Sequence, residues 1–264
     1  MKKIITFIRY VKDYLKFGEY YFLWTSIQYV LFKKINPKQR IYKSSLGTFL
    51  TRKGTLDFQF ANYAYEWSVK KFFLQNYQPY NVFLDIGSNI GTYCFLMAPK
   101  GLPCYAFEPV KENFEALMTN IRLNKLEDKI HPFPFGLGSE IMDADFIFEP
   151  MNTGASHLAK FHSYVENKGE IGQQEKVKIK TLDSLLDQLQ LKKEDKVLLK
   201  IDAEGMELDI IKGGTKFISN QPEFLMIMEK SHSDFDKIQE LFAQICKVSY
   251  QQIDEENVAI IKIL

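Results

Sequence analysis

The stretch NVFLDIGSNIG, residues 81–91, decides the fold of this chain. The apolar run 82–84 leads into an acid, Asp85, and then into Gly87 and Gly91, after which apolar residues recur at helical spacing. A short apolar run that turns tightly into a helix is typical of a buried parallel strand at the mouth of an α/β sheet. Gly87 allows the turn, and Gly91 allows a ligand or a facing strand to come close to the helix start.

The same stretch predicts a cofactor site. The N–H groups of a helix start favour a carboxylate or phosphate, and Asp85 beside them can hold a cationic or hydroxyl group. A dinucleotide fold would need G-x-G-x-x-G, but Asn89 and Thr92 stand where its second and third glycines belong. The spacing Asp85-x-Gly87-x-x-x-Gly91 instead resembles the first motif of class I S-adenosylmethionine-dependent methyltransferases. The resemblance implies that the cofactor is bound by Asp85, Gly87, Ser88, Asn89 and Gly91.

A second acid supports a nucleoside-containing cofactor. The apolar stretch 102–107 predicts the next strand, which ends at Glu108-Pro109. A carboxylate at the end of the adjacent strand can accept hydrogen bonds from both ribose hydroxyls, although a solvated strand-end glutamate is the plainer alternative. Pro109 and, after the third strand, Gly136 complete the predicted cofactor set.

Several ordered motifs resemble one methyltransferase family. The stretch VKIKTLDSLL (177–186) precedes LLKIDAEGMELDIIKGG (198–214) and a strand that ends at Glu229, and AFEPVKENFEALMTNIRLN (106–124) lies upstream. This order resembles the FkbM family of S-adenosylmethionine-dependent methyltransferases, over roughly residues 81–232. The resemblance implies methyl transfer, mostly O-methylation of sugar or polyketide hydroxyls, and does not identify the acceptor.

The predicted fold is α/β, a Rossmann-like class I methyltransferase sheet. It is mostly parallel with an antiparallel C-terminal strand pair, and helices cover both faces. We predict a basic N-terminal helical extension, residues 1–55, and a methyltransferase domain, residues 56–264. Residues 1–50 are expected to be helical with a break near Asn36-Pro37, and residues 58–77 to form one helix. The strand near 130–136 contains two prolines, which suits a sheet edge.

The predicted catalytic residues follow the fourth and fifth strands. Asp202 is our first choice for a general base or an acceptor-orienting group, His232 is the second, and Glu204 completes the set. Lys200 and Asp202 alternate in phase, so the lysine is expected to pair with an acid on that face. Asp202, Glu204, Glu229 and His232 could hold a divalent metal, but their spacing is not diagnostic and no metal site is assigned. The alternative is that Glu204 and Glu207 only begin a helix, and for Glu207 we favour it.

The loop Asn152–Lys160, NTGASHLAK, carries His157 between two predicted strands. Two interpretations stay open for it. It forms an acceptor-binding lid, or His157 is simply an exposed histidine in a polar loop.

Charge is divided unevenly along the chain. Residues 1–53 contain twelve Lys or Arg and two acids, a charge of +10, so a net +1 leaves −9 for the remainder. The uncharged stretch 20–32 would span about 20 Å as a helix, which is short of a bilayer core. A basic amphipathic pair within residues 1–34 could contact an anionic membrane surface peripherally, but packing on the catalytic domain or against a second copy is the favoured alternative. With no evident signal peptide and unpaired cysteine spacing, we expect a cytoplasmic protein, with the inner membrane face as the alternative.

The leading functional hypothesis is therefore O-methylation of a sugar or glycan hydroxyl. A polyketide or lipid hydroxyl, or a non-catalytic membrane-associated adaptor on the same fold, remains an alternative. A nucleic-acid methyltransferase would end its fourth strand in Asn- or Asp-Pro-Pro-aromatic, whereas this strand ends in DAEG, residues 202–205, so no nucleic-acid partner is expected. The missing glycines disfavour a nicotinamide oxidoreductase.

Overall fold

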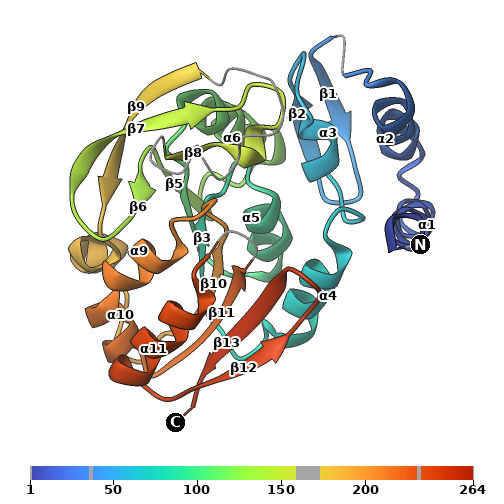
Figure 1. Cartoon of the computed structure of the whole chain (residues 1–264). Helices are drawn as coiled ribbons and strands as arrows, with labels where there is room; N and C mark the ends of the chain where they lie inside the picture. Colours follow the sequence, from blue (N-terminus) through green and yellow to red (C-terminus); the bar gives the residue numbers. More distant parts are fainter. Residues whose placement is uncertain (1, 36–37, 159–172, 231–232, 264) are drawn as a thin grey trace.

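A seven-stranded mixed sheet forms the centre of the molecule (Figure 1). The computed structural model describes residues 2–35, 38–158, 173–230 and 233–263. The strand order is β12-β13-β11-β10-β3-β4-β5, parallel from β11 to β5, with β13 antiparallel to both neighbours. The strands are β3 (Val82–Ile86), β4 (Cys104–Phe107), β5 (Ile130–Phe133), β10 (Lys196–Ile201), β11 (Glu223–Glu229), β12 (Val248–Gln252) and β13 (Asn257–Lys262). The predicted sheet, mostly parallel with an antiparallel C-terminal pair, is confirmed.

Helices cover both faces of this sheet, because its strands alternate apolar side chains between two cores. Val82 and Leu84 of β3 point into one core with α9, α10 and α11, while Phe83 points into the other with α4, α5 and α6. The described α-helices from residue 67 onward are α4 (Trp67–Asn76), α5 (Thr92–Met97), α6 (Lys111–Asn124), α8 (Leu186–Leu189), α9 (Glu207–Lys212), α10 (Thr215–Asn220) and α11 (Phe235–Ile245). The described 3-10 helices are η1 (Ala98–Lys100), η2 (Thr153–Ala155) and η4 (Leu182–Leu185).

The proline-containing strand lies at the sheet edge, as predicted. β5 has a single neighbour, β4, and Pro132 pairs with Ala106. An edge position tolerates a residue that cannot donate to the ladder. Pro134 lies just beyond the end of β5.

The chain after β5 forms a second sheet of four strands. Its order is β6-β9-β7-β8, and the two long strands β7 and β9 are antiparallel over their whole length. The strands are β6 (Gly136–Leu137), β7 (Met142–Phe148), β8 (His157–Leu158) and β9 (Gln173–Lys180). The two strands predicted on either side of the loop that carries His157 correspond to β7 and β9, and their pairing was not predicted.

The N-terminal segment is helical only in part, so the prediction of helix over residues 1–50 is wrong at its end. Helices α1 (Lys2–Lys16) and α2 (Tyr20–Phe32) are followed by an antiparallel hairpin, β1 (Arg40–Lys43) and β2 (Thr48–Thr51). Side chains of α6 supply the partners that the β2 backbone would otherwise lack: Asn124 Oδ1 accepts from Thr48 N at 2.8 Å, and Asn120 Oδ1 from Leu50 N at 2.8 Å. The hairpin depends on these long-range contacts, which no local pattern reveals.

The predicted helix over 58–77 is also broken. It consists of α3 (Asp57–Phe60), an irregular segment, and α4, with Glu66 at a positive φ of 50° immediately before α4.

Hydrophobic side chains of the N-terminal segment, such as Phe22 and Phe49, share one core with Phe83 of the central sheet. The boundary near residue 55 remains a prediction, but contacts cross it extensively. Within the described residues, no helix is both long enough and apolar enough to cross a membrane.

Candidate active site

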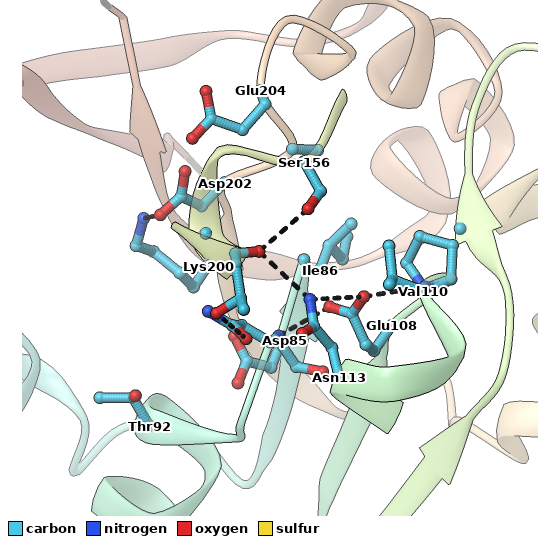
Figure 2. Close-up of a pocket in the computed structure, with 18 of the residues that line it drawn as sticks. Asp85, Ile86, Thr92, Glu108, Val110, Asn113, Ser156, Lys200, Asp202 and Glu204 are labelled. Atoms are coloured by element: carbon cyan, nitrogen blue, oxygen red, sulfur yellow. Dashed lines mark hydrogen bonds and ion pairs between the residues drawn. The ribbon is translucent and has the colours of Figure 1, made fainter. Parts of the chain in front are cut away.

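A pocket opens at the carboxyl ends of the parallel strands, where open α/β sheets bind ligands (Figure 2). Strands β3, β4, β10 and β11 each contribute residues at or just beyond their ends. The segment 60–66 and the loop 152–156 supply further walls. Of the residues predicted to hold a cofactor, those that line the pocket are Asp85, Gly87, Ser88, Asn89, Glu108, Pro109 and Gly136.

Two glycines shape the turn after β3 in different ways. Gly87 has φ +82°, and a Cβ there would lie 1.9 Å from the carbonyl oxygen of Asp202, so glycine is required where β3 and β10 end together. Gly91 has φ +95° and does not line the pocket; its Cβ would lie 2.6 Å from Leu117 Cδ1. The close approach that Gly91 allows is therefore that of α6 to α5, rather than that of a ligand or a strand.

Glu108 is held rigidly by the protein backbone. Its Oε2 accepts from Asn89 N at 2.8 Å and its Oε1 from Val110 N at 2.9 Å. Burial raises the pKa of this carboxyl to about 7, although the backbone hydrogen bonds oppose the shift. Each carboxylate oxygen has further lone pairs, so Glu108 can still accept hydrogen bonds from two ligand hydroxyls.

Asp85 and Ser88 present unsatisfied polar atoms to the pocket. Asp85 Oδ2 and Ser88 Oγ are buried without a hydrogen-bond partner among the described residues. Burial also raises the pKa of Asp85 to about 7. Buried polar atoms are usually paired, so these two suit a ligand that brings its own donors. The ammonium and ribose hydroxyls of S-adenosylmethionine fit this arrangement of Asp85, Ser88 and Glu108.

A hydrogen-bonded network connects Glu108 to the N-terminal segment. Asn113 Nδ2 donates to Thr153 O at 3.2 Å and lies 3.5 Å from Glu108 Oε1, and Asn113 Oδ1 accepts from Arg52 Nη1 at 3.0 Å. Arg52 also forms a bidentate ion pair with Asp57, through Nε and Nη2, both at 2.8 Å. The Asp57 side chain is fully buried. Arg52 therefore joins β2 to the side of the pocket that holds Glu108.

The loop 152–156 lies over the same side. Thr153 Oγ1 is 3.3 Å from Asn89 Oδ1, and Thr153, Gly154 and Ser156 line the pocket. His157 belongs to β8, is completely buried, and its Nδ1 lies 2.8 Å from Ala155 O. The interpretation of His157 as an exposed histidine is wrong, because β8 pairs with β7 and draws the side chain inward.

Acidic groups dominate the opposite side of the pocket, around one buried lysine. Lys200 Nζ lies 3.0 Å from Asp202 Oδ2, as the strand phase predicted. Burial would lower the pKa of Lys200, but the carboxylates of Asp202, Glu66 and Glu229 together outweigh it and the pKa is raised. Burial, followed by the charges of Asp202 and Glu229, raises the pKa of Glu204 well above its usual range. In Figure 2, Asp202 and Glu204 lie together on one side, and Glu108 lies on the other.

Glu207 has the structural role that we favoured. Its carboxylate accepts from Ala203 N at 3.0 Å and from Gly205 N at 3.1 Å, and so holds the turn that follows β10. Glu204 adopts φ +46° within this turn, and the residue lines the pocket. His232 lies outside the described residues. Among the residues that the structure does describe, no group of three or more His, Cys, Asp or Glu could hold a metal ion.

One wall of the pocket was not predicted from the sequence. Tyr65 and Glu66 come from the irregular segment before α4, and Tyr93 of α5 donates its hydroxyl to Glu66 Oε2 at 2.5 Å. Lys70, fully buried, donates to Tyr65 O, and burial lowers its pKa to about 8. Asn113, in contrast, had a usable signal, because it shares one face of a predicted helix with Asn120.

The sheet order, the glycine turn after β3 and the acid after β4 define the fold of class I S-adenosylmethionine-dependent methyltransferases. Residues 85–252 match the Methyltransferase FkbM domain. The chain belongs to this family.

Three known proteins are similar to this chain. The hexuronic acid methyltransferase AglP of Haloferax volcanii is 29% identical over 157 residues, which are 59% of each protein. This chain thus spans 59% of the length of that relative. A crystal structure of methyltransferase FkbM from Methylobacillus flagellatus KT has a TM-score of 0.47 at 16% identity, covering 70% of this chain and 44% of that one. The N-terminal domain of human METTL16 in complex with SAH has a TM-score of 0.42 at 16% identity, with coverages of 90% and 78%.

Proposed function

We propose that this protein methylates a hydroxyl group of a sugar or glycan, with S-adenosylmethionine as the donor. Membership of the FkbM family supports methyl transfer, and the relative named as a hexuronic acid methyltransferase supports a sugar-like acceptor. The observation that carries the proposal is the pair of carboxylates, Asp202 and Glu204, on the side of the pocket opposite Glu108.

The cofactor is assigned to the side built from the ends of β3 and β4. Glu108 would accept hydrogen bonds from the ribose hydroxyls, and Asp85 Oδ2 would accept from the ammonium group. Gly87 keeps the wall free of a side chain where β10 approaches. When bound, the cofactor supplies a methyl group already activated on a sulfonium, so positioning of the acceptor accounts for much of the rate.

The acceptor is assigned to the side that holds Asp202 and Glu204. The ammonium of Lys200 fixes one oxygen of Asp202, which leaves the carboxylate suited to orient a sugar hydroxyl by accepting its proton in a hydrogen bond. Glu204 has the raised pKa, so in its ionised form it is the stronger base and takes the hydroxyl proton as the new bond forms. His232 remains a sequence-based alternative for this role.

The test compares Asp202→Asn and Glu204→Gln with the unaltered chain. The substrates are neutral sugars, uronic acids and hydroxylated polyketides or lipids, each with and without a chelator, and the readout is formation of S-adenosylhomocysteine. We expect turnover on a sugar, lowered by about 100-fold or more in each variant. S-adenosylmethionine binding, measured by calorimetry, should stay close to that of the parent. Parental turnover in both variants, or turnover restricted to non-sugar acceptors, would contradict the proposal.

A further inference from the structure

Helix α2 exposes large apolar side chains on the side that faces away from the protein. Tyr20, Trp24 and Leu31 recur at spacings of four and seven residues, and Phe32 ends the helix. Their exposed fractions are 66%, 60%, 65% and 66% in that order. These four residues are called the apolar face of α2. The opposite side is covered, because Phe22 and Thr25 are buried and the Phe22 ring contacts Tyr42 of the hairpin.

The methyltransferase fold does not explain why these four large apolar side chains are exposed. A helix that is apolar on every side is normally buried in a large core or placed in a lipid environment. Its 13 residues extend about 20 Å, which is too short to cross a bilayer. Figure 1 shows α1 and α2 at one edge of the molecule, and the four side chains of the apolar face of α2 are exposed there.

Exposed lysines follow the apolar face of α2 in the chain and lie on the neighbouring helix α1. Lys33 and Lys34 follow α2 directly and are exposed, and Lys33 Nζ lies 4.9 Å from the centre of the Tyr29 ring. Lys12 and Lys16 of α1 are exposed as well. Of the two acids in this segment, Glu19 is turned inward and accepts from Ser45 N at 2.7 Å and Ser45 Oγ at 2.5 Å. The four exposed lysines Lys12, Lys16, Lys33 and Lys34 are called the basic rim.

We propose that the apolar face of α2 and its basic rim dock on an anionic phospholipid surface. Tryptophan and tyrosine favour the boundary between headgroups and acyl chains, and lysines beside them bind anionic headgroups. The charge of +10 on residues 1–53 is attracted to such a surface, while the charge of −9 on the remainder is repelled. The molecule would therefore bind in one orientation, with α2 toward the lipid.

A second copy of the chain fits this surface less well. A twofold contact through α2 would place each patch against itself, so that Lys33 and Lys34 of one copy face the same basic rim of the other. Like charges across a contact oppose association. The charge pattern therefore favours lipid over self-association.

The proposal is tested by sedimentation of the full chain with two kinds of vesicle. One kind is phosphatidylcholine alone, and the other contains phosphatidylglycerol as well. We expect the protein to pellet with the anionic vesicles, and to do so less at high salt. The combined change Trp24→Ser, Leu31→Ser and Phe32→Ser should lower the vesicle-bound to free ratio by about tenfold or more.

A matched control and a second readout keep the result interpretable. Ile141 is 69% exposed, far from α2 along the chain, so Ile141→Ser should pellet like the parent. Circular dichroism checks that each variant is folded. Because the chain has two tryptophans, Trp67→Phe leaves Trp24 as the single reporter, and its fluorescence should shift to the blue on anionic vesicles.

Two outcomes would overturn the proposal. In the first, the parent stays in the supernatant with both vesicle types, or the triple variant pellets as well as the parent. In the second, light scattering finds a dimer in solution that the triple variant dissociates, and vesicles do not bind; the apolar face of α2 is then a contact between copies.

Discussion

The two sides of the pocket are built in opposite ways. On the side proposed to bind the cofactor, called the cofactor side, each oxygen of Glu108 receives a backbone N–H, so hydrogen bonds to the main chain fix its position. On the side proposed to bind the acceptor, called the acceptor side, Asp202 and Glu204 share their surroundings with Glu229 and depend on the ammonium of Lys200.

Because of this difference, mutations are expected to affect the two sides of the pocket in different ways: through backbone position on one side and through protonation on the other. A carboxylate held by the main chain moves little when a neighbouring side chain changes. Cofactor binding is therefore expected to be lost mainly through substitutions that move the backbone. A group of acids around one cation changes protonation when any member is substituted. Substitutions on the acceptor side are therefore expected to change the pH dependence of turnover.

The largest effect is expected from Gly87→Ala. The new Cβ would lie 1.9 Å from the Asp202 carbonyl oxygen, so the ends of β3 and β10 must separate. We expect the free energy of unfolding to fall by about 3 kcal/mol or more, and cofactor binding to be lost. Urea denaturation and calorimetry measure these two quantities.

Gly101→Ala is the matched control for that change. Gly101 has φ +96°, but a Cβ there would meet nothing within 4 Å. It should lower the free energy of unfolding by only about 1 kcal/mol, the effect of the positive φ alone. Equal losses in both variants would show that the approach of β10 is not what requires glycine at position 87.

Next in size is the change that removes the link between β2 and the cofactor side. Arg52→Ala leaves the fully buried carboxylate of Asp57 without its cation, and should lower the free energy of unfolding by about 3 kcal/mol. It should also weaken S-adenosylmethionine binding, because Asn113 loses the partner that orients it toward Glu108. Lys196→Ala breaks an exposed pair with Glu223 and should change stability by less than about 1 kcal/mol. Similar losses in the two variants would contradict this account.

The smallest effect is the pH dependence of the cofactor side. Asp85 and Glu108 have ordinary pKa values of 3.8 and 4.5, raised by burial to about 7 in the folded protein. Their neutral forms favour the folded state, so this stabilisation is present below about pH 4 and is lost as the pH rises through 7. Cofactor affinity should change in the opposite direction and strengthen several-fold between pH 6 and 8, because the ionised carboxylates accept its donors.

Calorimetric titrations of S-adenosylmethionine across this pH range measure the effect. Asp85→Asn removes one of the two titrating groups and should flatten the curve. A dissociation constant that does not change between pH 6 and 8 in the parent chain would show that these carboxyls are already ionised.

The sequence predicted the pocket residues at strand ends better than the wall formed by Tyr65 and Glu66, for a physical reason. Asp85, Gly87 and Glu108 stand at strand ends, where hydrophobic runs and glycine turns are local signals. The segment 61–66 interrupts an apparently helical pattern, and nothing local indicates that Tyr65 and Glu66 turn toward the pocket. The hairpin β1–β2 was missed for the same reason, since its partners lie some 70 residues further along the chain.

The asparagine contacts of α6 also have a consequence for the order of folding. Thr48 and Leu50 bond to Asn124 and Asn120, at sequence separations of 76 and 70 residues. Contacts between distant residues form late, since a long loop must close before they stabilise anything. We therefore expect the segment synthesised first to dock last, and the side of the pocket that holds Glu108 to gain its Arg52 support only once α6 is in place.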